Sequence, residues 1–272
     1  MGDRSAIEWT QATWNPVTGC TKVSPGCAYC YAEAFTLRFK RGGRYIPGHT
    51  TIKTHADRLE MPLKWRRPRL IFVNSMSDLF HEEVPDSFII ETFQIMKQAS
   101  HHVFQVLTKR HTRMAELAPK LPLPDNVWMG VSVENQHWVE QRIPELKKVP
   151  AKVRFLSCEP LLKALDLTRY LDDIHWVIVG GESGPKARPI HADWVRRIRD
   201  DSVAAGVPFF FKQWGGRTSK ARGRILEGRT WSDMPLKPPS PPTQHRPVGH
   251  QSVSLAEPAA SSLASEQPMA QV

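Results

Sequence analysis

Short apolar runs alternate along the chain with longer segments that mix apolar and polar residues. The runs are rich in β-branched and aromatic side chains and carry little charge. Continuous apolar runs of this kind are typical of parallel strands that are buried on both faces of a sheet. The pattern predicts strands at Leu70–Asn74, Val103–Thr108, Val127–Val133, Val153–Ser157, Trp176–Gly180 and Pro208–Lys212, and a shorter strand near Glu8–Trp14.

The longer segments carry apolar residues at helical spacing. In Pro85–Ala99 the apolar positions follow a period near 3.6 residues, and Asp86 is suited to cap the helix. Helices are also predicted at Cys30–Lys40, Asn135–Lys147 and His191–Ala205. Strands that alternate with helices predict an α/β fold with right-handed crossovers, here a parallel-stranded, partial TIM-type barrel. A doubly wound open sheet is the alternative, and the pattern alone does not separate the two.

The composition of the chain changes at Pro235. Residues 235–272 are rich in Pro, Ser and Ala and have almost no aromatic side chains. Such a segment buries too little apolar surface to offset the entropy lost on ordering. We therefore predict a single domain over residues 1–234 and a disordered tail over residues 235–272.

Two features bear on where the protein works. No apolar run approaches the roughly 18 residues of a membrane-spanning helix. The first residues contain no apolar signal-peptide core. We expect a cytoplasmic protein that has no membrane partner.

The charge balance indicates an anionic partner. The formal net charge is +10, and nucleic acid is the first candidate for a surface of this kind. Basic and aromatic residues are interleaved in 64–69 and 214–231, as in proteins that hold single-stranded nucleic acid. A solvated basic surface that keeps the protein soluble gives the same pattern, so both interpretations stay open.

Polar residues follow the predicted strands at the point where each strand ends. In parallel α/β barrels the carboxyl ends of the strands meet at one edge, where active sites are found. Some of these residues are equally suited to cap the next helix. We predict substrate contacts for Asp78, Lys109 and Lys212. Further site residues are expected among Asn74, Ser75, Ser77, Thr108, Ser132, Glu134, Ser157, Glu159, Glu182, Ser183 and Gln213.

Three of the four cysteines form one C-x6-C-x2-C loop, made of Cys20, Cys27 and Cys30. Clustered cysteines in a cytosolic chain indicate metal or redox chemistry. Structural zinc sites and cubane iron–sulfur clusters usually take four protein ligands, so three thiolates leave one position open. We predict a 4Fe–4S cluster. A zinc site completed by His49, His55 or another histidine, or simple buried cysteines, are the alternatives.

The loop resembles that of the radical S-adenosylmethionine (SAM) enzymes, whose usual spacing is C-x3-C-x-aromatic-C. Residues 27–30 (CAYC) match its second half, with Tyr29 in the aromatic position, whereas the first gap is six residues instead of three. The folded part also resembles an uncharacterised, phage-associated, radical-SAM-like family that is encoded near three-Cys-motif partner proteins. The segments that carry this resemblance are Trp14–Glu33, Asn74–Pro85, Trp128–Gln136, Phe155–Leu162, Trp176–Pro189 and Phe209–Gly216.

The resemblance implies an enzymatic activity. Cys20, Cys27 and Cys30 would bind three irons of the cluster, and SAM would bind the fourth. After reduction by an electron donor, SAM would be cleaved to methionine and a 5′-deoxyadenosyl radical, which would abstract hydrogen from a nucleic acid or nucleotide. A three-Cys-motif partner protein is a further implied partner.

The resemblance also implies where SAM would lie. Tyr29 would lie against the adenine. The ribose or amino group would be bound by Ser132, Glu134 and Glu159, and the backbone would approach SAM closely at Gly180, Gly181 and Glu182. A non-catalytic nucleic-acid-binding protein with a structural zinc or Fe–S site is the alternative function, since the first cysteine gap departs from the enzyme pattern.

Overall fold

The computed structural model of the chain describes residues 5–41 and 51–235. All of these residues belong to one unit, Met1–Pro238. The single domain predicted over residues 1–234 remains a prediction. Apart from Pro235, the tail predicted over 235–272 lies outside the described residues, as does His49.

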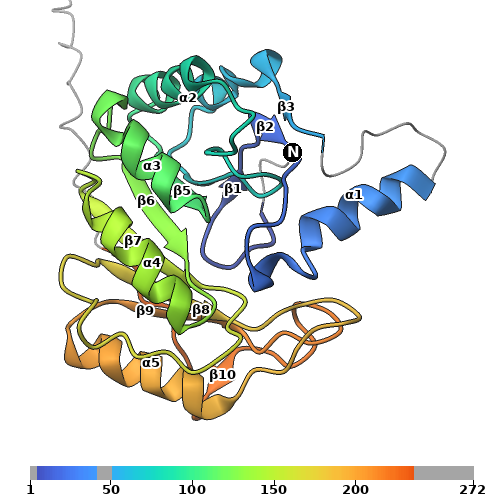
Figure 1. The fold of residues 1–272 in the computed structure, drawn as a ribbon, viewed down its shortest axis with the longest axis vertical. Coiled ribbons are helices and arrows are strands. Elements are labelled where there is room, and N and C mark those ends of the chain that lie inside the picture. Colours follow the sequence, from blue (N-terminus) through green and yellow to red (C-terminus); the bar gives the residue numbers. More distant parts are fainter. Residues whose placement is uncertain (1–4, 42–50, 236–272) are drawn as a thin grey trace, which may run out of the picture. The chain divides into compact units, whose positions relative to one another are not determined.

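A sheet of seven parallel strands organises the fold (Figure 1). Neighbouring strands follow chain order from one edge to the other, so the order never reverses as it does in a doubly wound sheet. The predicted α/β fold with a parallel-stranded partial barrel is confirmed. In order, the strands are β1 (Ala12–Thr13), β4 (Leu70–Val73), β5 (Val103–Thr108), β6 (Val127–Ser132), β7 (Val153–Cys158), β8 (Trp176–Gly180) and β9 (Phe209–Gln213).

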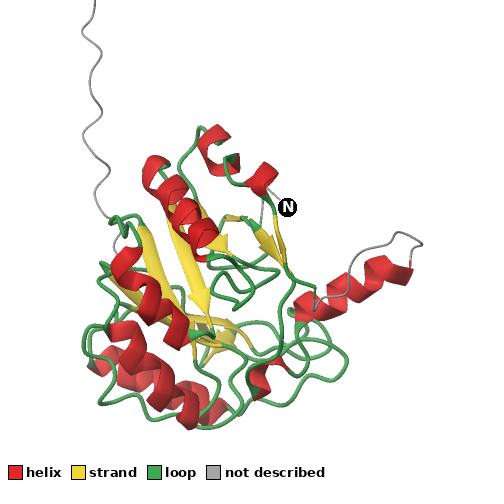
Figure 2. Cartoon of the chain, turned by 45° about the horizontal axis from the view of Figure 1, so that its top comes forward, coloured by secondary structure: helices red, strands yellow, loops and turns green. Residues whose placement is uncertain are grey.

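Helices cover one face of this sheet (Figure 2). Three of them lie close to the predicted ranges: α2 (Asp86–Gln98), α4 (Gln136–Lys147) and α5 (Ala192–Ala204). A further short helix, α3 (His111–Leu117), occupies a segment for which no helix was predicted from the sequence. The helix after the cysteines is α1 (Tyr31–Arg41).

The small elements lie outside the main sheet. Two antiparallel pairs join β2 (Val17–Thr18) to β3 (Lys53–Thr54) and β10 (Ile225–Leu226) to β11 (Arg229–Thr230). The short 3₁₀ turns of the described residues are η1 (Pro25–Cys27), η2 (Ala56–Arg58), η3 (Met61–Lys64) and η4 (Ala118–Lys120).

None of the described helices is long and apolar enough to cross a membrane.

The strands are buried on both faces, as their continuous apolar runs predict. In β8, Val177 and Val179 pack in the core beneath the helices, whereas Trp176 and Ile178 pack in a second cluster on the opposite face. Trp176 is the centre of that second cluster, because the rings of Trp128, Phe155 and Phe210 lie about 6 Å from it. This aromatic layer fills the interior of the partial barrel.

A buried histidine makes the stability of this fold depend on pH. His102 is 0% exposed, and its Nε2 donates to the carbonyl of Pro62 over 3.0 Å. Burial, together with the positive charge of His101, lowers the pKa of His102 to about 4. In the unfolded chain the group titrates near its ordinary value of 6.5. Below that pH only the unfolded chain takes up the proton, so stability falls as the pH drops from 6.5 toward 4.

We expect the free energy of unfolding to fall by about 2–3 kcal/mol between pH 7 and pH 4.5 through His102 alone. Urea denaturation at several pH values measures this change. The control is His102→Gln, which can keep the donor to Pro62 but does not titrate. Equal pH slopes for the two proteins would contradict the assignment.

Candidate functional site

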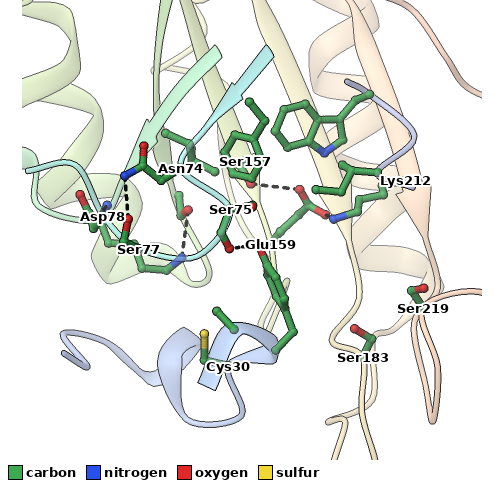
Figure 3. Close-up of a pocket in the computed structure, with 18 of the residues that line it drawn as sticks. Cys30, Asn74, Ser75, Ser77, Asp78, Ser157, Glu159, Ser183, Lys212 and Ser219 are labelled. Atoms are coloured by element: carbon green, nitrogen blue, oxygen red, sulfur yellow. Dashed lines mark hydrogen bonds and ion pairs between the residues drawn. The ribbon is translucent and has the colours of Figure 1, made fainter. Parts of the chain in front are cut away.

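A cavity of about 410 Å³ opens at the carboxyl ends of the strands (Figure 3). All three cysteines of the loop line it, together with residues at the carboxyl ends of β4 to β9 or just after them. Its apolar lining includes Trp9, Phe72 and Leu107. Of the residues predicted for the site, the cavity brings together Cys20, Cys27, Cys30, Asn74, Ser75, Ser77, Asp78, Thr108, Lys109, Ser132, Ser157, Glu159, Ser183, Lys212 and Gln213.

The cysteine loop runs from β2 to α1. Cys20 follows a glycine with φ of 90°, Cys27 ends the 3₁₀ turn η1, and Cys30 directly precedes α1. Burial and the negative charge of Asp78 raise the pKa of the Cys20 thiol to about 11. A metal bound there takes the thiolate, so loading the site releases this proton.

A buried ion pair anchors the turn that carries Cys27. Glu134 and Arg142 are both fully buried and lie 2.7 Å apart. The other carboxylate oxygen of Glu134 accepts from the hydroxyl of Ser24 and from the backbone N–H of Gly26 (3.3 Å). Glu134 was predicted to contact SAM, but the structure turns its carboxylate toward the loop, and it is not among the cavity-lining residues.

The close approach of Glu134 explains why residue 26 is glycine. A Cβ on Gly26 would lie 2.8 Å from Oε1 of Glu134, and Glu134 is held in place by Arg142. We expect Gly26→Ala to lower the free energy of unfolding by about 1–3 kcal/mol through overpacking and to reduce the iron bound per chain. Chemical denaturation and iron analysis measure the two effects. Ala28→Ser also adds one atom to the loop, but at an exposed position, and is expected to change neither.

A second anchor joins the loop to the end of β8. Glu182 pairs with Arg188 at 2.6 Å, and Arg188 donates to the carbonyl of Pro25 over 3.0 Å. The Arg188 guanidinium also lies 5.2 Å from the centre of the Tyr29 ring. Tyr29 is 43% exposed and, like Glu182, is not among the cavity-lining residues, whereas Tyr31 is.

The third anchor is Arg110, one of the basic residues that follow the predicted strand Val103–Thr108. Its Nη2 donates to the carbonyl and the hydroxyl of Thr21, next to Cys20, over 3.2 and 2.9 Å. Its Nη1 pairs with Glu82. The signal in the sequence was its position directly after Lys109 at the end of a predicted strand. The loop is therefore held from the ends of β5, β6 and β8.

One cation in the cavity carries no carboxylate partner. Asp78 is nearly buried, and its oxygens accept from the hydroxyl of Thr108 (2.7 Å) and the backbone N–H of Lys109 (2.9 Å). The ammonium of Lys109 donates to Oγ of Ser132 over 3.1 Å. Within 5–41 and 51–235 no acidic side chain pairs with it. Lys109 is thus placed to bind an anionic group.

The opposite wall of the cavity carries an ion pair. Glu159 accepts from Nζ of Lys212 over 2.8 Å and from the hydroxyl of Ser157 over 3.1 Å, and Cys30 lies across the cavity from them (Figure 3). A Cβ on Gly180 would lie 2.6 Å from Oε1 of Glu159, and one on Gly181 would lie 2.2 Å from the carbonyl of Trp214. The two glycines, predicted to admit SAM, make room for groups of the protein itself.

The donor set is compatible with the predicted iron–sulfur cluster, because such clusters are held by cysteine thiolates. Three thiols line one cavity, and the predicted cluster assigns each thiolate to a different iron. No three Cys, His, Asp or Glu side chains of the described chain are grouped to hold one metal ion. His55 and His81 form hydrogen bonds with Thr18 and Thr21. Cys158 is fully buried in the core and is not among the cavity-lining residues, although its neighbours Ser157 and Glu159 are.

Comparison with known families gives one match that covers most of the chain. The model of the family described as "Protein of unknown function (DUF5131)" matches residues 4–235. A search of the curated proteins found no match.

Comparison with solved structures finds spore photoproduct lyase. A mutant of that protein superposes with a TM-score of 0.50 at 9% identity, over 73% of this chain and 75% of that one. A mutant with the dinucleoside spore photoproduct gives 0.47 at 12% identity, over 68% of this chain and 58% of that one. This chain thus matches less than two thirds of the length of the latter. The likeness concerns the fold alone, and there it agrees with the predicted radical-SAM-like partial barrel.

Proposed function

The chain belongs to the DUF5131 family, and we propose that it is a radical SAM enzyme that acts on nucleic acid or on a nucleotide. One observation carries the proposal: three thiols of a single loop line a cavity at the carboxyl edge of a radical-SAM-like partial barrel. The three anchors of that loop support it, because a ligand set must be held rigidly to bind a cluster.

In this proposal Cys20, Cys27 and Cys30 hold a 4Fe–4S cluster. With SAM bound beside these cysteines, a reduced cluster would supply the electron for cleavage of SAM to methionine and a 5′-deoxyadenosyl radical. The apolar side chains of Trp9 and Phe72 exclude water from the cavity.

The polar residues of the cavity divide into two groups in the proposal. Ser132 and Glu159 are the candidates to bind SAM, since both reach the cavity. Asp78, Lys109 and Lys212 are the candidates to contact the substrate, and an ammonium such as that of Lys109 suits a phosphate. The net charge of +10 supports an anionic substrate. Tyr29, Gly180, Gly181 and Glu182 are assigned to shaping the loop and the strand ends.

Anaerobic reconstitution tests the proposal. We expect about four irons and four sulfides per chain, and 5′-deoxyadenosine after reduction in the presence of SAM. Bound zinc with no deoxyadenosine would overturn the proposal in favour of a non-catalytic nucleic-acid-binding protein. The external electron donor, the phage association and a three-Cys-motif partner protein remain predictions.

A further inference from the structure

Two loops lie side by side at the mouth of the cavity. One follows β8 (residues 181–191) and the other follows β9 (residues 214–224). The backbone N–H of Gly184 donates to the carbonyl of Gly216, and that of Gly216 donates to the carbonyl of Glu182, both over 2.9 Å. Ser183 from the first loop and Ser219 from the second line the cavity (Figure 3). The two loops therefore form one edge of its entrance.

These loops carry four exposed cations without partners. Lys186 lies on the first loop, and Arg217, Lys220 and Arg222 lie on the second; we call these four residues the basic rim. None of them forms an ion pair, a side-chain hydrogen bond or a ring contact with any residue in the described part of the chain. Residues 183–192 and 214–226 contain no Asp or Glu. The rim is thus a local excess of positive charge.

The neighbouring helix α5 carries arginines that are paired, in contrast to the cations of the rim. Its three arginines all pair with acidic side chains, and Arg196 and Arg199 both bind Glu227. Arg197 pairs with Asp166 at 3.0 Å. Cations that repel one another without compensation leave a surface ready for an external anion. The rim differs from α5 in this respect, and it is also the more exposed of the two, since Arg196 and Arg199 are half-buried.

We propose that the basic rim binds the backbone phosphates of a nucleic-acid strand and so presents a nucleotide of that strand to the cavity. The delivery step rests on the proposed function, whereas the binding step does not. Cations spread over two loops outside the cavity match a repeating row of phosphates rather than the single phosphate group of a free nucleotide.

The position of the thiols in the cavity indicates whether the bound nucleic acid is single-stranded or a duplex. The three thiols line the cavity, whereas none of the four rim cations does. A base within a duplex does not reach such a site unless it is extruded or already unpaired. The strand is therefore single-stranded, or locally opened, at the position that enters.

Salt-dependent binding tests the inference. The probe is a labelled single-stranded DNA of about 12 nucleotides, within the span of one binding site. The protein is the full, reconstituted chain, and fluorescence anisotropy gives Kd between about 50 and 200 mM salt. Four phosphate contacts predict a slope of about −3 for log affinity against log salt. The RNA of the same sequence shows whether the sugar matters.

A triple variant, Arg217→Gln with Lys220→Gln and Arg222→Gln, removes three of the four rim cations. It is expected to weaken binding about 10- to 100-fold at low salt and to reduce the slope by about 2. The matched control changes Arg196, Arg197 and Arg199 to Gln, which alters the net charge equally but removes cations that are already paired. The control is expected to bind within about threefold of the parent. Circular dichroism verifies that both variants fold.

Three outcomes would overturn the inference. The first is an equal loss of DNA affinity in the two variants, and the second is a mononucleotide that competes as effectively as the strand. The third is polyglutamate that binds as tightly as the strand, which would indicate an acidic protein partner. Deoxyadenosine formed without nucleic acid is measured on the same preparations. Normal SAM cleavage with no binding of the strand would refute nucleic-acid binding by the basic rim and leave the proposed function intact. Rim-dependent binding with no SAM cleavage would refute the proposed function alone.

Discussion

Replacing Cys20, Cys27 or Cys30 by alanine is expected to abolish SAM cleavage and to remove most of the bound iron. Each thiol lines the cavity, and in the proposed site each holds a different iron, so no remaining side chain compensates for its loss. Even the removal of a group that only supports a metal ligand typically costs 10- to 100-fold. We expect the loss on removing a ligand to exceed 100-fold, measured as 5′-deoxyadenosine formed per chain.

The fourth cysteine gives a matched control. Cys158 is fully buried in the core beneath the helices, and burial raises the pKa of its thiol. Cys158→Ala is expected to keep the iron content and the cleavage rate. If Cys158→Ala loses iron as the loop variants do, the cluster has a fourth protein ligand and lacks the open position that SAM needs.

Removal of Glu134 is expected to lower the free energy of unfolding by about 3–5 kcal/mol. Glu134→Ala leaves the guanidinium of Arg142 buried and without its carboxylate. An uncompensated buried charge is strongly destabilising. It also frees Ser24 and Gly26, so the turn that carries Cys27 loses its anchor. Urea denaturation and iron content measure the two consequences.

A paired replacement separates these effects. Glu134→Gln with Arg142→Met leaves no buried charge. Because Nε and Nη2 of Arg142 have no hydrogen-bond partner even in the parent, much of the stability should return. A surface control is Asp125→Asn, which breaks the exposed pair with Lys152 and should cost less than about 1 kcal/mol. If Glu134→Ala and Asp125→Asn lower the free energy of unfolding equally, burial does not account for the effect at Glu134.

The partial barrel could be predicted because its signal is local. A strand buried on both faces is apolar at every position, and this holds for Trp176–Gly180 whatever the rest of the chain does. The edge strand was less well predicted, because only Ala12 and Thr13 of the expected 8–14 range pair with β4. Helix α3 was missed because its basic residues concealed a short apolar face formed by Met114 and Leu117.

The supports of the cysteine loop could not be predicted in the same way. Arg188 binds the carbonyl of Pro25 across 163 positions of sequence, and Glu134 binds Ser24 across 110. No local period reports a contact of that kind. The sequence placed Glu134 and Glu182 correctly at strand ends, yet their partners come from the protein itself. Asp78, Lys109, Glu159 and Lys212, with the same sequence signal, line the cavity.

The three anchors of the cysteine loop bear on how the protein would mature in the cell. Arg110, Glu134 and Arg188 hold the loop through protein contacts alone, and they come from strands that meet only after the sheet has formed. Small zinc domains, by contrast, fold only when their metal binds. In this protein the binding site would be formed before the iron–sulfur cluster binds. A preassembled cluster would then be inserted into the folded apoprotein. The apoprotein would itself be stable.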